Sequence, residues 1–110
     1  RYKHINTYQS GLRDKSANHL YILKINFNKT KLKKNEIMEK LSNHGINTQV
    51  HYIPVYRHPY YQSMRRVSEL PGAEEFYSGC LSIPLFPEMK KTEQQKVINA
   101  LKKLVEELRN

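Results

Sequence analysis

The alternation of apolar and polar residues predicts three short strands. The stretch SANHLYILKINF (16–27) alternates over its second half, where every second residue from position 21 to 27 is apolar, and this is typical of a half-buried strand. The residues on that face are Tyr21, Leu23, Ile25 and Phe27. The stretch TQVHYI (48–53) is the second predicted strand and stops at Pro54, which has no amide to donate to a sheet. The third predicted strand, CLSIPLF (80–86), is interrupted by a proline.

Apolar residues at helical spacing predict two amphipathic helices. The first, KNEIMEKLSNHG (34–45), ends at Gly45, a residue suited to the left-handed cap position, and Ile46 follows as its apolar partner. The second, TEQQKVINALKKLVEELRN (92–110), opens with a capping box formed by Thr92 and Gln95. Its apolar stripe consists of Val97, Ile98, Leu101, Leu104, Val105 and Leu108.

Two further segments are predicted to be helical. LPGAEEFYSG (70–79) is a short helix opened by a Pro-Gly turn. Residues 1–10 have Tyr2, Ile5 and Tyr8 at a spacing of three and Gly11 as a stop, which predicts the last turns of a helix. The order of all elements predicts an α/β (α+β) two-layer sandwich, in which helices cover one face of a small three-stranded sheet.

Composition limits what such a chain can be. Its 110 residues are enough for one domain with one core, and its single cysteine, Cys80, excludes an internal disulfide. No apolar run is long enough to span a bilayer and the N-terminus has no signal-peptide pattern, so we expect a cytoplasmic protein without a membrane partner. The first residue is not Met, and we expect the chain to be a piece of a longer protein.

The basic charge is confined to the first third of the chain. Residues 1–35 contain nine Lys or Arg and one acid, whereas residues 36–110 contain ten Lys or Arg and nine acids. A basic arm can bind nucleic acid, and a free-standing basic module that binds nucleic acid or a partner protein is therefore the alternative reading. A solvated lysine-rich surface explains the same charge, and we do not expect nucleic acid as a partner.

The segment TQVHYIPVYRHPYY (48–61) holds the candidate chemistry. Its histidines, His51 and His58, are not at the spacing of a metal motif, and no nucleophile motif or glycine-rich phosphate loop occurs in the chain. Four tyrosines beside an arginine could stack nucleic-acid bases, but no RNA-binding signature accompanies them. A rigid aromatic wall of a substrate pocket is the reading we favour, and simple packing of the tyrosines stays open.

The order of several motifs resembles one known family. HGINTQVHYIPVYRHPYYQ (44–62) and LPGAEEFYSGCLSIPLFPEMKKTEQQKVINAL (70–101) resemble the C-terminal small domain of the DegT/StrS family of pyridoxal-phosphate-dependent nucleotide-sugar aminotransferases. The stretch TQVHYIPV followed by HPYY is closest to the branch that makes UDP-4-amino-4,6-dideoxy-N-acetyl-L-altrosamine for pseudaminic acid. The strand that resembles the family's S-L-P-L-F-P carries Ile83 in place of the usual leucine.

The resemblance implies a function for the whole enzyme and a limited role for this chain. It implies amino transfer, usually from glutamate, to a keto-sugar nucleotide, in a homodimer of the fold-type I class. It implies that residues 1–14 end an interdomain helix or linker and that residues 15–110 are the small domain. It further implies that pyridoxal phosphate (PLP) and its Schiff-base lysine belong to the missing N-terminal domain, so that this chain has no catalytic or cofactor-binding residue and is inactive alone. By the same resemblance, His51, Tyr52, Tyr60 and Tyr61 contact the substrate.

Overall fold

A three-stranded antiparallel sheet forms the centre of the computed structural model, which describes residues 5–8, 15–64 and 70–109. The strands are β1 (Ile5–Thr7), β2 (Tyr21–Ile25) and β3 (Cys80–Ile83), in the order β1-β2-β3. Leu23 of β2 pairs with Thr7 of β1 on one side and with Leu81 of β3 on the other. β2 is therefore the central strand. The predicted fold class, a small sheet with helices, is confirmed.

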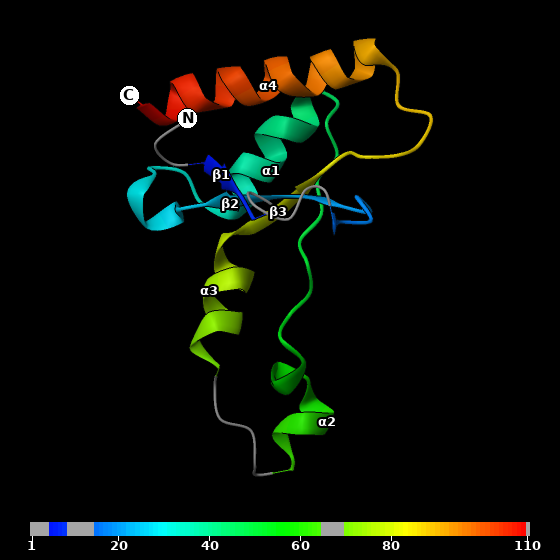
Figure 1. Ribbon diagram of the computed structural model, residues 1–110. Coiled ribbons are helices and arrows are strands. Elements are labelled where there is room, and N and C mark those ends of the chain that lie inside the picture. Colours follow the sequence, from blue (N-terminus) through cyan, green and yellow to red (C-terminus); the bar gives the residue numbers. More distant parts are fainter. Residues whose placement is uncertain (1–4, 9–14, 65–69, 110) are drawn as a thin grey trace.

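Helices α1 (Lys34–Asn43) and α4 (Lys91–Arg109) lie on the same side of the sheet, whereas α3 (Pro71–Gly79) and the short α2 (Pro59–Gln62) project away from the other side (Figure 1). The core forms between the sheet and helices α1 and α4, because the apolar stripe of each helix faces the core. Its fully buried side chains include Ile25, Ile37, Leu41 and Leu81. The predicted arrangement, with the helices on one face of the sheet, thus holds for α1 and α4 only.

Local chemistry explains where the helices begin and end. Helix α1 ends as predicted: Gly45 has φ of +71°, its amide donates to the Ser42 carbonyl at 2.7 Å, and the Ile46 amide donates to the Leu41 carbonyl at 2.9 Å. The capping box predicted for α4 is wrong. The helix begins one residue earlier, and the carboxylate of Glu93 accepts the Lys90 amide at 2.8 Å.

Two predicted elements differ from the structure. Residues 5–7, predicted to end a helix, form β1, because pairing with β2 satisfies their backbone groups. Residues 1–4 and 9–14 lie outside the described residues. The strand predicted over 48–53 is reduced to a single bridge, in which Gln49 and Ser82 exchange amide–carbonyl hydrogen bonds of 3.1 and 2.8 Å. After that bridge the chain leaves the edge of β3.

Candidate substrate-contacting arm

Residues 51–64, called the arm below, run away from the sheet alongside α3 (Figure 1). The arm contains the 3-10 turn η3 (Val55–Arg57) and helix α2, which begins at Pro59 after the extended residue His58. Proline fits this first helical position because no intrahelical partner is needed for its missing amide. The arm therefore has a defined backbone conformation although it has no strand.

The four predicted site residues lie on the arm as two ring pairs. His51 and Tyr52 meet edge to face with ring centroids 6.2 Å apart, so they do not point to opposite sides as they would in a regular strand. Tyr60 and Tyr61 on α2 meet edge to face at 5.2 Å. Tyr52 is 82% exposed and Tyr60 is 68% exposed. Such rings present apolar area and a hydroxyl to whatever covers the arm.

His51 is the best-anchored member of the four. Its Nε2 shares a short hydrogen bond with the hydroxyl of Ser82, a buried residue of β3. Its carbonyl accepts a weak hydrogen bond from the Cys80 thiol at 3.8 Å. The base of the arm is thus fixed to β3. Ser82 is a positioning residue: the sequence motif placed it in a strand but did not indicate its contact with His51.

Exposed large apolar side chains gather on and next to the arm. The exposed ones in this region are Tyr52, Ile53, Val55, Tyr60, Tyr61, Met64 and Leu70. Exposed apolar groups in one region of a surface usually mark a contact with a ligand or another protein. Simple packing within this domain, the open alternative from the sequence, does not account for tyrosines as exposed as Tyr52 and Tyr60.

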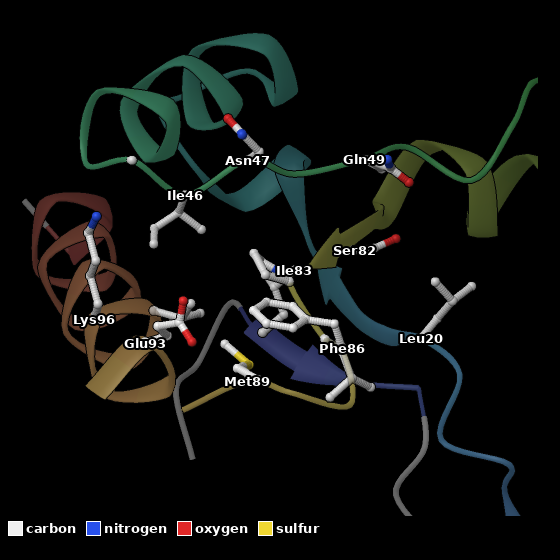
Figure 2. Close-up of a pocket in the computed structure, with 14 residues that line it drawn as sticks. Leu20, Ile46, Asn47, Gln49, Ser82, Ile83, Phe86, Met89, Glu93 and Lys96 are labelled. Carbon is white, nitrogen blue, oxygen red and sulfur yellow. The ribbon is translucent and has the colours of Figure 1, made fainter. Parts of the chain in front are cut away.

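A cavity of about 460 Å³ lies at the other end of β3 (Figure 2). Ile83, Phe86 and Met89 form its apolar wall, and Glu93 and Lys96 of α4 lie at its polar rim. Two of its polar groups already have partners, since Glu93 accepts the Lys90 amide and Ser82 bonds to His51. The other polar residues that line it are Asn47, Gln49 and Lys96.

Metal and membrane chemistry receive no support from the described residues. In residues 5–8, 15–64 and 70–109, no group of three or more His, Cys, Asp or Glu stands close enough to hold a metal ion. Within the same ranges, no helix combines the length and the apolar character needed to cross a bilayer.

Comparison with known proteins identifies the family. Residues 2–102 match the model of the DegT/DnrJ/EryC1/StrS aminotransferase family. The chain belongs to this family. The resemblance expected from the HYIPV, HPYY and LPGAE motifs is thereby confirmed.

Relatives of this DegT-family chain include characterised and uncharacterised proteins. An uncharacterised protein of Methanocaldococcus jannaschii is 37% identical over 97 residues, which cover 86% of this chain and 25% of the relative. The UDP-4-amino-4,6-dideoxy-N-acetyl-beta-L-altrosamine transaminase of Helicobacter pylori is 35% identical over 95 residues, again 86% of this chain and 25% of the relative. The chain thus spans about a quarter of the length of these relatives.

The fold agrees with a solved member of the family. Helicobacter pylori PseC, an aminotransferase involved in the biosynthesis of pseudaminic acid, superimposes with a TM-score of 0.83 at 31% identity. The match covers 94% of this chain and 28% of PseC. The Streptococcus pneumoniae protein Spr1654, at 23% identity and a TM-score of 0.78, shows the same fold.

Proposed function

We propose that this chain is the C-terminal small domain of a PLP-dependent aminotransferase. The whole enzyme transfers an amino group from glutamate to a keto-sugar nucleotide, in the cytoplasm, for the synthesis of a cell-surface glycan. The observation that carries the proposal is the family match over residues 2–102, combined with coverage of only a quarter of each relative. The substrate class follows the names of the relatives, a UDP-sugar transaminase and PseC.

In this proposal the arm forms one wall of the substrate pocket. His51, fixed by Ser82, presents its ring edge beside Tyr52, and Tyr60 and Tyr61 offer two further rings with hydroxyl groups. Rings of this kind cover the apolar faces of a sugar or a nucleobase, and their hydroxyl groups hydrogen-bond to its polar substituents. These residues bind and orient the substrate, and they exclude water from the reacting carbon.

The described residues do not fit a PLP site by themselves. The cofactor supplies an electron sink for amino transfer and is held by a lysine in a dry pocket. Burial lowers the pKa of Lys34, but its Nζ donates to the Tyr77 carbonyl and lies over two rings, so it has no free path to a cofactor. Lys96 at the rim of the 460 Å³ cavity is exposed. We therefore assign the cofactor and its lysine to a domain outside this chain, and we expect the chain alone to be inactive.

The exposed apolar groups suggest what the whole enzyme assembles with. Beyond the substrate, we propose that the arm meets the cofactor domain and that the enzyme is a homodimer, as its family implies. A free-standing module that binds nucleic acid or a partner protein is the alternative that the experiment below distinguishes. The lysines of residues 1–35 would be its contact surface.

The experiment begins with the reading frame upstream of the Arg1 codon. The full-length protein is expected to absorb light as a PLP enzyme and to aminate a UDP-4-keto-6-deoxy sugar with glutamate as donor. Tyr60→Ala is expected to raise KM for the sugar nucleotide about tenfold, whereas Phe86→Ala, which truncates an exposed aromatic residue away from the arm, leaves KM unchanged. A full-length protein that binds neither PLP nor the sugar nucleotide, or an upstream region with no coding frame, would contradict the proposal.

A further inference from the structure

The arm has no hydrophobic core of its own. Among the described residues between 51 and 78, every side chain is exposed or only partly buried. The core cluster is drawn from residues 23–46 and 81–108 instead. A segment without buried apolar contacts keeps its position only through polar contacts and its own backbone turns. The base of the arm is held by the contact between His51 and Ser82 of β3, and beyond it the polar contacts with α3 decide where Tyr60 and Tyr61 lie.

Those contacts converge on one carboxylate, that of Glu74 on α3. The Nε of Arg57 donates to Glu74 Oε1 at 2.9 Å, and a second guanidinium nitrogen donates to Oε2. The hydroxyl of Tyr56 donates to Oε1 as well. The arginine and the tyrosine are consecutive residues of the η3 turn, so three hydrogen bonds to one side chain fix the turn in position and in orientation.

The surroundings of this carboxylate give it a fixed geometry. Glu74 is partly buried, with its side chain 25% exposed, and it lies in the first turn of α3, where a negative charge is stabilised. The guanidinium of Arg57 also stacks over the ring of Tyr77 at 5.6 Å, one turn along the same helix. Burial and the bond to Glu74 raise the pKa of Tyr56, which keeps its hydroxyl a donor.

We propose that Glu74 is a positioning residue for the substrate: by holding η3 against α3, it sets where Tyr60 and Tyr61 stand, three and four residues after the turn ends at Arg57. This inference rests on the proposed function for its substrate part, but the mechanical part stands on the contacts alone. Glu74 contacts neither substrate nor cofactor in this scheme. The LPGAE motif contains it, although the motif by itself gives it no partner.

The mechanical part is tested by hydrogen exchange on the chain. In Glu74→Gln, the amides of Tyr61 and Gln62, which both donate to the His58 carbonyl, are expected to exchange about tenfold faster. Glu75→Gln is the matched control, because Glu75 is the next residue of α3 and pairs with Lys24 at 2.5 Å rather than with the arm. Unchanged protection of α4 amides in each sample verifies that the variant is folded. Equal exchange rates in the two variants would overturn the proposal.

The substrate part is tested on the full-length enzyme. Glu74→Gln is expected to raise KM for the sugar nucleotide about tenfold while kcat and the KM for glutamate stay within about twofold. Arg57→Met reproduces this change, and the double variant adds little to it, because both remove the same contact. Faster exchange without a change in KM would overturn the role in substrate positioning. A full-length enzyme with no aminotransferase activity would refute the proposed function and that role with it, while the exchange data would still decide whether Glu74 holds the arm.

Discussion

Truncating Ile37 and Ile98 to alanine separates burial from residue type. Both isoleucines lie in amphipathic helices, α1 and α4, and both lose the same three carbon atoms. Ile37 is 0% exposed in the core, whereas Ile98 is 38% exposed and lines an apolar groove of about 350 Å³ between α4 and the sheet. The sequence pattern places Ile98 in the same apolar stripe as its buried neighbours. Comparing the two variants therefore tests the difference in burial that the structure shows.

The structure sets the expected size of each loss. A buried methylene group stabilises the fold by roughly 0.8 kcal/mol, and the three fully buried carbons of Ile37 give roughly 2.4 kcal/mol. The cavity left behind costs more than the gain in helix propensity returns, so we expect a loss of unfolding free energy of about 3 kcal/mol. At Ile98 only part of the side chain is removed from water and no closed cavity forms, so we expect about 1 kcal/mol after the gain in helix propensity. The difference of about 2 kcal/mol corresponds to a factor of about 30 in the unfolding equilibrium.

Urea denaturation followed by circular dichroism measures both losses. The slope of the free energy against urea must agree among the variants, so that the midpoints report stability. A loss at Ile37 below about 1.5 kcal/mol would refute the core assignment, because that is less than the transfer term alone. A loss at Ile98 as large as that at Ile37 would mean that the groove is closed, and a shift in gel filtration with concentration would then show self-association through it.

Further predictions concern single residues. Gly45→Ala is expected to lower the free energy of unfolding by about 1 kcal/mol because alanine resists the left-handed conformation, whereas Gly72→Ala, where an added Cβ meets nothing within 4 Å, is expected to raise it by about 0.5 kcal/mol; urea midpoints check both. The hydrogen bond and charge of Lys24 lower the pKa of Glu75 from its ordinary 4.5, so the stability that this pair contributes is present above pH 4.5 and lost as the pH falls through the lowered value; Glu75→Gln is expected to flatten the acid limb of a pH–stability curve. The buried thiol of Cys80 is expected to react with a thiol reagent only as fast as the fold opens, and a rate independent of urea would contradict its burial.

Periodicity predicted the helices and the central strand because their signals are local. An apolar stripe at helical spacing and a glycine cap each need only a few neighbouring residues, and Gly45 followed by Ile46 forms the predicted cap. The prediction for residues 5–7 was wrong because a strand of three residues is too short to show an alternating pattern. The spacing of Ile5 and Tyr8 suits a helix, and only pairing with β2, many residues later, selects the strand.

The candidate site was predictable in composition but not in geometry. The motifs placed His51, Tyr52, Tyr60 and Tyr61 in one segment, and all four lie on the arm, while their contact with substrate stays a prediction. Residues 48–53 were predicted to form a strand that ends before Pro54, yet only Gln49 pairs, because the chain turns away from β3 after one bridge. The hydrogen bonds from the η3 turn to Glu74 join residues 17 and 18 positions apart, a separation at which no spacing rule applies.

The absence of buried residues between positions 51 and 78, among those the structure describes, has a consequence for how such a domain diversifies. The core is complete without this segment (residues 51–78, called the excursion below), which leaves the sheet after Gln49 and returns at Cys80. Because closing a loop costs only about 0.6 kcal/mol more for each doubling of its length, residues can be inserted or exchanged there at little cost to folding. Evolution can therefore reshape what the excursion recognises while the scaffold stays constant, and an engineer can graft a different excursion between the same two attachment points.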